Sequence, residues 1–263
     1  MERAVAAHLT GRVGESAEVV LAVTVAHGPQ LSEELRVTVD GRPVEVTEIS
    51  ADAGTRLHVC RLPVGDLQVD YSATVRGAAP VEPVSALDRI TYTRPSRYCD
   101  SDTMAAVALA EFGSLAGKPL LDAVSSWVGR QLRYVSGWSR PTDGAVDTFL
   151  ARAGVCRDFA HLVVTLLRAR NVPARVAAVY APGLSPMDFH AVAEAFLDGA
   201  WFVVDATTLA PRSSMLRIAT GRDAADTAFM TTLSGVANLT DLSVEAVVDS
   251  LPDDDLTELV QLT

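Results

Sequence analysis

Hydrophobic and polar residues alternate with a period of two over the first third of the chain. Residues 18–25, 36–40 and 67–72 are examples of short segments with this pattern. Asp40-Gly41 follows one of them and is a typical hairpin turn. Residues 87–93 read as a last strand or an extended crossover. Short alternating segments at regular spacing, without a helical pattern, predict a small all-β sandwich domain over residues 1–93.

The hydrophobic period changes to that of a helix after residue 94. Residues 104–112 and 119–132 carry apolar side chains on one helical stripe, which predicts two amphipathic helices. A third helix is predicted over residues 156–170 and is apolar almost all round, so we expect it at the centre of a domain. Asn171 offers a left-handed stop for this helix, and Pro173 prevents its continuation.

The period returns to two beyond the central helix. Residues 174–180, 190–197 and 201–205 read as strands, and Asp198-Gly199 reads as a tight turn between the second and the third. Residues 236–248 form one more strand or a short helix. Helices followed by an antiparallel sheet predict an α+β domain over residues 94–263.

Composition and charge narrow the function classes. The chain has 263 residues, of which 49% are hydrophobic, and a formal net charge of −11. Such a chain is globular, and nucleic-acid binding is not expected because there is no cluster of basic residues. No apolar run is long enough to cross a membrane, and the start shows no secretory signal. Three widely spaced cysteines argue against a disulfide framework and favour the reducing cytoplasm.

Cys156 is the first candidate for chemistry. It lies in the first turn of the predicted central helix, directly after Gly154-Val155. Free N–H groups and the positive end of the helix dipole at this position stabilise a thiolate, which is the reactive form of cysteine. A buried cysteine is nevertheless more often a packing residue than a nucleophile, so Cys156 needs a base nearby.

The predicted strand register identifies His190 as the candidate for that base. If Asp198-Gly199 is a two-residue hairpin loop, Leu197 lies opposite Ala200 and His190 lies opposite Thr207. Asp205 then projects from the same face as His190, as a diagonal neighbour. If the central helix packs on that face, Cys156, His190 and Asp205 form a nucleophile, a base and an orienting carboxylate.

For several other polar residues, a structural role is a better interpretation than catalysis or metal binding. His161 is more than one helical turn from Cys156, so we expect a structural role, and no metal-binding spacing supports a zinc site that includes both. The carboxylates of Asp100 and Asp102 should raise the pKa of Cys99 and make it a poor nucleophile. No phosphate-binding or EF-hand motif occurs, so neither a cofactor nor a metal is expected.

Several segments resemble a known family. Residues 154–162 (GVCRDFAHL), 172–175 (VPAR), 188–191 (DFHA) and 201–207 (WFVVDAT) are similar to the transglutaminase-like core of the papain-like thiol superfamily, in particular to bacterial transglutaminase-like cysteine peptidases. Residues 94–99 and 221–226 also resemble that branch. The resemblance implies helices packed on an antiparallel sheet, after a small β domain.

The resemblance also implies a mechanism, with Cys156 as nucleophile, His190 as base and Asp205 as orienting residue. The expected activity is acyl transfer through a thioacyl-enzyme, most simply hydrolysis of a peptide or amide. A transamidase, an amide-forming acyltransferase and a non-catalytic interaction protein are the alternatives. The backbone N–H of Cys156 is one expected oxyanion donor, and Trp138 and Gln131 are candidates for the second. Expected substrates are peptides, amides or thioesters, and the oligomeric state is open.

Overall fold

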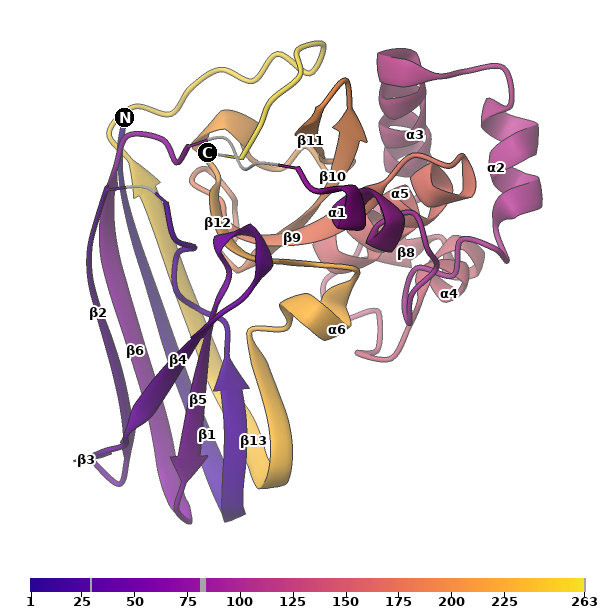
Figure 1. Cartoon of the computed structure of the whole chain (residues 1–263). Helices are drawn as coiled ribbons and strands as arrows, with labels where there is room; N and C mark the ends of the chain where they lie inside the picture. The colour runs from indigo at the N-terminus through magenta and orange to yellow at the C-terminus, as the bar shows by residue number, and fades with distance from the viewer. Residues whose placement is uncertain (29, 81–83, 263) are drawn as a thin grey trace.

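The computed structural model of the chain describes residues 1–28, 30–80 and 84–262. Figure 1 shows a long curled sheet on one side, a group of helices on the other, and a second sheet between them. The strands are β1 (Glu2–Leu21), β2 (Gln30–Val39), β3 (Arg42–Pro43), β4 (Val46–Ser50), β5 (Arg56–Leu62), β6 (Gly65–Arg76), β7 (Arg133–Tyr134), β8 (Ala153–Gly154), β9 (Ala174–Tyr180), β10 (His190–Leu197), β11 (Ala200–Val204), β12 (Leu216–Gly221) and β13 (Met230–Val248). The helices are α1 (Ala86–Thr91), α2 (Ala105–Phe112), α3 (Gly117–Gln131), α4 (Ala145–Ala151), α5 (Cys156–Ala169) and α6 (Ala224–Thr227), with short 3-10 helices at Asp52–Gly54 and Arg212–Ser214.

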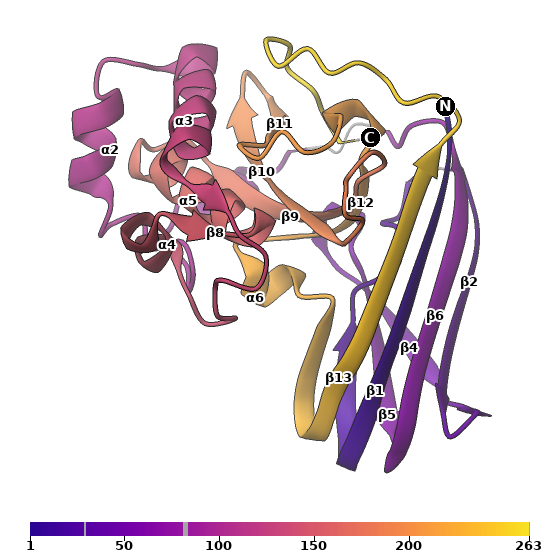
Figure 2. The same ribbon diagram turned by 180° about the vertical axis from the view of Figure 1, so that it is seen from behind.

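The long strand β1 organises the N-terminal sheet. Its first half pairs with β6, its second half pairs with β5, and β13 lies along nearly its whole length on the other side. All strands of this region therefore belong to one curled seven-stranded sheet (Figure 2). The predicted all-β character of the region is confirmed, but among the described residues its strands do not divide into the two sheets of a sandwich, because β1 runs through both halves.

Strand β13 brings the end of the chain back to its beginning. Arg3 pairs with Val248 and Leu21 pairs with Met230, so the two strands run antiparallel over their full lengths. The segment expected at 236–248 is thus a strand, and it joins the N-terminal sheet. The division of the chain into units at residues 1–93 and 94–263 stays a prediction.

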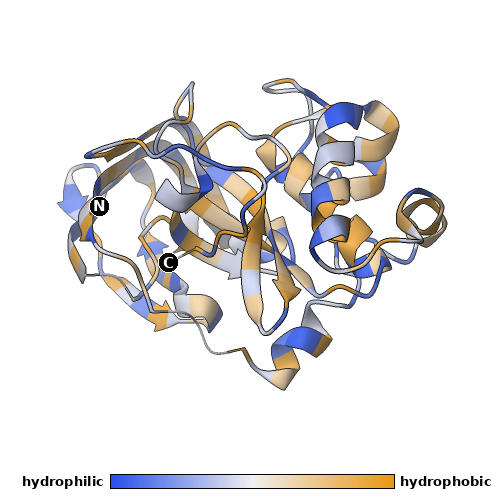
Figure 3. Cartoon of the chain, turned by 90° about the horizontal axis from the view of Figure 1, so that it is seen from above, coloured by the Kyte–Doolittle hydropathy of each residue, from blue (hydrophilic) through white to orange (hydrophobic). Residues whose placement is uncertain are grey.

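The second sheet and the helices form the mixed part of the fold. Its strand order is β11-β10-β9-β12, and every pair is antiparallel. Helix α5 packs against β9 and β10, while α2, α3 and α4 surround it. Figure 3 shows both hydrophilic and hydrophobic residues on the helices around α5, whereas α5 itself is buried from Asp158 to Arg168. The predicted α+β class and the central position of this helix are confirmed.

The two sheets share a hydrophobic core. Tyr180 from β9 and Leu216 and Ile218 from β12 are buried among the apolar residues of the N-terminal sheet. The hydroxyl of Tyr180 donates to the carbonyl of Val23 at 2.6 Å, and its ring stacks on Tyr71. Apolar burial of this kind holds the curled sheet against the mixed part of the fold.

Residues 87–93 are not a strand. Helix α1 occupies most of them and begins at a capping box, in which the Ser85 hydroxyl accepts from the Asp88 N–H and the Asp88 carboxylate accepts from the Ser85 N–H. These two bonds satisfy donors that a helix start leaves free. None of the helices in the described ranges has the length and apolar character needed to span a bilayer.

Candidate active site

Helix α5 begins at Cys156, and the carboxylate of Asp158 fixes this start. Asp158 is fully buried and accepts a hydrogen bond from the N–H of Val155 at 2.8 Å. A Cβ atom on Gly154 would lie 2.6 Å from the Cβ of Asp158, so only glycine leaves room for this carboxylate. Cys156 therefore sits at the first position of α5, as predicted, and its side chain is half-buried.

The same carboxylate fastens a loop to the start of α5. Asp158 also accepts from the hydroxyl of Ser139, and from Arg157 at 2.7 Å. The guanidinium of Arg157 donates in turn to Ser139 Oγ and to the carbonyl of Arg140, both at 3.0 Å. These bonds hold the loop between β7 and α4 beside Cys156. Nothing in the spacing of the sequence pointed to this cluster, although a carboxylate at the third helical position is a capping signal.

The hairpin of β10 and β11 brings His190 and Asp205 together. Leu197 pairs with Ala200 and Ala193 pairs with Val204, which confirms the predicted two-residue turn and its register. His190 Nε2 lies 3.1 Å from Asp205 Oδ2. Both side chains are almost completely buried, with exposed fractions of 1% for His190 and 5% for Asp205.

Thr207 holds the other oxygen of Asp205. Its backbone N–H and its hydroxyl donate to Asp205 Oδ1 at 2.8 and 2.7 Å. Both carboxylate oxygens are thus occupied, so its orientation toward His190 is fixed. Burial raises the pKa of Asp205, but the bonds from His190 and Thr207 outweigh burial and lower it overall. The sequence analysis placed Thr207 opposite His190 but did not predict its hydrogen bonds to Asp205.

Cys156 meets His190 at the end of the sheet. The thiol donates a long hydrogen bond, 4.0 Å from Sγ to O, to the carbonyl of Phe189, the residue just before β10. Ala193 and Ala195 face α5, whereas Val192, which has the parity of His190, lies in the core on the opposite side. The body of α5 therefore covers the face of the sheet that carries Ala193 and Ala195. Its first turn approaches His190 at the first residue of β10.

The pKa of His190 reflects both neighbours. Burial lowers it because a buried ring disfavours charge, but the hydrogen bonds and negative charges of Asp205 and Cys156 together raise it to about 10. Asp205 occupies Nε2, and Nδ1 is buried without a hydrogen-bond partner among the described residues. The ring thus keeps one nitrogen for the thiol and one for the carboxylate.

Tyr134 of β7 also lies near the start of α5. It pairs in parallel with Gly154, and the next residue, Val135, donates its N–H to the Gly154 carbonyl at 2.9 Å. The Tyr134 ring packs against Phe159, with centroids 6.0 Å apart. Burial and the nearby negative charge of Cys156 raise the pKa of Tyr134 to about 12. Sequence reasoning missed this residue, because the pairing of β7 with β8 involves only two residues of each strand.

The two side chains that were expected as oxyanion donors, Trp138 and Gln131, have different surroundings. Trp138 belongs to the loop beside Cys156, and its side chain points largely into solvent, with an exposed fraction of 57%. Gln131 ends α3 and accepts a hydrogen bond from Arg152. It lines an open groove with Trp127 and Phe149, so its amide is held on the outer side of the helices.

The remaining cysteines and His161 are structural. Cys60 and Cys99 are buried, and burial raises their pKa values to about 11 and about 12. For Cys99 this burial is the main cause, in place of the Asp100 and Asp102 charges that we expected. His161 accepts the Ala224 N–H at 3.1 Å and stacks on Tyr98. Within the described residues no group of three or more metal-ligating side chains occurs.

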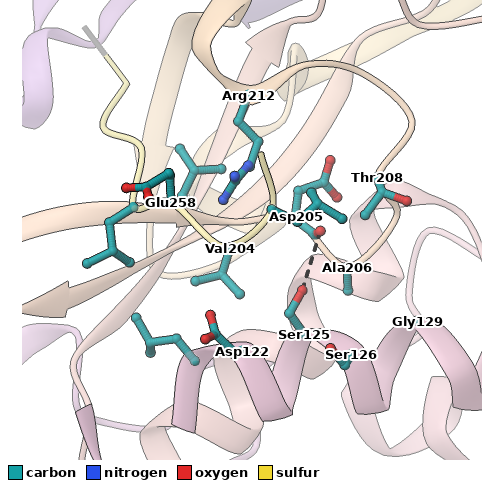
Figure 4. Close-up of a pocket in the computed structure, with 14 residues that line it drawn as sticks. Asp122, Ser125, Ser126, Gly129, Val204, Asp205, Ala206, Thr208, Arg212 and Glu258 are labelled. Carbon is teal, nitrogen blue, oxygen red and sulfur yellow. Dashed lines mark hydrogen bonds between the residues drawn. The ribbon is translucent and has the colours of Figure 1, made fainter. Parts of the chain in front are cut away.

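A cavity of about 270 Å³ lies behind Asp205 (Figure 4). Helix α3, the end of β11 and the C-terminal segment line it. The Ser125 hydroxyl donates to the backbone carbonyl of Asp205 at 3.4 Å, and Arg212 is held by Asp254 at 2.9 Å. The lining includes Asp205 but neither Cys156 nor His190, so this cavity is separate from the thiol.

Comparisons with known proteins identify the family of this fold. Residues 113–206 match the family model of the transglutaminase-like superfamily. The crystal structure of a proposed cysteine protease from Cytophaga hutchinsonii is 34% identical and has a TM-score of 0.86, with 97% of this chain and 92% of that chain covered. An uncharacterized protein of Mycobacterium leprae is 25% identical over 218 residues, which are 73% of this chain and 76% of its relative.

The fold and the site thus combine a helix tip that carries a cysteine with a neighbouring histidine–aspartate pair. The chain belongs to the transglutaminase-like superfamily.

Proposed function

We propose that this chain is a thiol-dependent acyl-transfer enzyme that hydrolyses peptide or amide bonds through Cys156, His190 and Asp205. The observation that carries the proposal is the 3.1 Å contact of His190 Nε2 with Asp205 Oδ2, which leaves Nδ1 for the thiol. The comparison with a proposed cysteine protease supports the same class of reaction.

The reaction begins with the Cys156 proton held on His190, because the raised pKa of the ring favours its charged form at neutral pH. The thiolate attacks the substrate carbonyl carbon, a C–S bond forms, and the carbonyl π electrons move to oxygen. As this intermediate collapses, the C–N bond breaks and His190 returns its proton to the leaving amine. Water then attacks the thioester with His190 as base, which releases a carboxylic acid and regenerates the thiol. Asp205 orients the ring and stabilises its charged form throughout.

An amine acceptor is the second candidate, and Asp188 favours it. This exposed carboxylate lies two residues before His190, and its charge acts on both His190 and Tyr134. A carboxylate at the mouth of the site attracts a positively charged acceptor or side chain. If such an amine replaced water in the second step, the product would be a new amide.

Thiol labelling tests the proposed chemistry. Cys156 should react with iodoacetamide far faster than Cys60 and Cys99, as followed by peptide mass spectrometry, because those two are buried thiols with raised pKa values. His190→Ala should slow the labelling of Cys156. Equally slow labelling of all three cysteines would contradict the proposal and favour a non-catalytic interaction protein on the same fold.

A trapped acyl-enzyme separates the two acceptors. p-Nitrophenyl acetate should acetylate Cys156, and mass spectrometry then follows loss of the acetyl group in water and in added ethylenediamine. Loss at the same rate in both would support hydrolysis. Loss only with the diamine would establish the transamidase alternative.

Because a nucleophilic thiol must stay reduced, we also propose the cytoplasm as the compartment.

A further inference from the structure

The tetrahedral intermediate on Cys156 carries a negative oxygen that needs hydrogen-bond donors. The backbone N–H of Cys156 is one, because the first residues of a helix have no intrahelical acceptor for their N–H groups. A single donor leaves the other lone pairs of this oxygen without a partner. A second donor must therefore lie within reach of both the Cys156 N–H and its Sγ atom.

Tyr134 is placed at this position by its backbone. The parallel pairing of β7 with β8 sets Tyr134 beside Gly154, two residues before the nucleophile, and the Val135 N–H to Gly154 bond fixes that register. The ring then lies against Phe159 in the first turn of α5. The ring therefore lies beside the first turn of α5, which carries Cys156, and Cys156 is among the groups that raise the pKa of the phenol.

We propose that the hydroxyl of Tyr134 is the second oxyanion donor of this site. This inference rests on the proposed acyl transfer. When the carbonyl carbon bonds to Sγ, its electron pair moves onto the oxygen, which then accepts from the Cys156 N–H and the Tyr134 O–H. No proton is transferred in this contact, and both hydrogen bonds weaken when the carbonyl re-forms as the thioester.

The protonation state and the exposure of Tyr134 suit an oxyanion donor. A pKa of about 12 keeps the phenol protonated at neutral pH, so that it donates a hydrogen bond and does not compete as an anion. The side chain is 45% exposed, so a substrate can reach it from solvent. The rival donors are placed less well, since the Trp138 side chain is mainly in solvent and Gln131 is engaged by Arg152.

Two reagents separate an oxyanion donor from a residue that only supports the thiolate. Acetylation of Cys156 by p-nitrophenyl acetate passes through a tetrahedral oxyanion, whereas alkylation by iodoacetamide is a direct displacement at carbon without one. Tyr134→Phe keeps the ring on Phe159 and removes only the hydroxyl. Trp138→Phe is the matched control, because it removes the rival N–H from the same loop region.

Tyr134→Phe should slow acetylation on the order of 100- to 1,000-fold, the effect of losing one oxyanion donor. Alkylation should stay near the wild-type rate, and Trp138→Phe should change neither reaction. Equal loss in both reactions of Tyr134→Phe, or no loss in either, would overturn the inference, as would a selective loss in Trp138→Phe. Wild-type Cys156 that resists both reagents would instead overturn the proposed function, and the inference with it.

Discussion

Thr207 holds one oxygen of the Asp205 carboxylate while His190 contacts the other. The Thr207 hydroxyl donates to Oδ1 at 2.7 Å, and His190 Nε2 lies 3.1 Å from Oδ2. A carboxylate held at both oxygens cannot rotate away from the imidazole. The orientation of His190 toward Cys156 thus depends on a threonine that does not itself contact the thiol in this arrangement.

Thr207→Val should lower the rate of acetylation of Cys156 by about 10- to 100-fold, because a hydrogen bond to a charged group is worth about 1.5–3 kcal/mol. The acid limb of the pH–rate profile should move to higher pH, since the lost bond helps to keep the pKa of Asp205 low. Asp255 and Thr257 form the same pair of bonds, at 2.7 and 2.9 Å, on the surface. Thr257→Val is therefore the control, and an equal effect of both variants would contradict the prediction.

Asp158→Asn should destabilise the protein by about 2–4 kcal/mol, because the buried carboxylate caps α5 and pairs with Arg157. Urea denaturation measures this loss. Asp88 caps the exposed helix α1 by the same bond geometry, so Asp88→Asn should cost at most about 1 kcal/mol. The prediction fails if the two variants lose the same stability.

The hairpin of β10 and β11 could be predicted from local sequence signals. Asp198 and Gly199 adopt positive φ angles of 48° and 93°, which such a two-residue turn requires, and the register of β10 and β11 follows from the turn alone. Asn171 likewise ends α5 with a φ of 59°. These features depend on neighbours in the chain, and so His190 and Asp205 could be paired from the sequence.

Relationships between distant segments could not be predicted in the same way. The pairing of β13 with β1 joins residues more than 200 positions apart, and no turn sets its register. The side of the sheet that α5 covers is also decided by packing, so the sequence could give it only as a condition for the meeting of Cys156 and His190. Tyr134 was missed because only the three-dimensional pairing of β7 with β8 places it beside Gly154.

His190 should make the protein less stable as the pH rises above neutral. Its pKa is about 10 in the folded chain, through Asp205 and Cys156 against the effect of burial, and about 6.5 when unfolded. The charged ring thus contributes its full stabilisation below about pH 6.5 and loses it as the pH rises toward 10. Urea unfolding at pH 7 and pH 9 should show a decline of up to about 1.4 kcal/mol per pH unit in the wild type. His190→Gln should lack this decline, and parallel curves for the two proteins would refute the prediction.

His161 should act in the opposite direction and at acid pH. Burial lowers its pKa to about 4. The ring accepts the Ala224 N–H and stacks on Tyr98. The unfolded ring binds a proton near pH 6.5, so its contribution to stability is present above that pH and is lost as the pH falls toward 4. Wild-type unfolding free energy should therefore drop by up to about 1.4 kcal/mol per pH unit across this window, beyond the drop in His161→Gln. The carboxylates titrate in both proteins, so the difference between the two urea-denaturation series isolates His161. A constant difference from pH 6.5 to pH 4.5 would show that the folded ring binds its proton at the same pH as the unfolded ring, and would contradict the prediction.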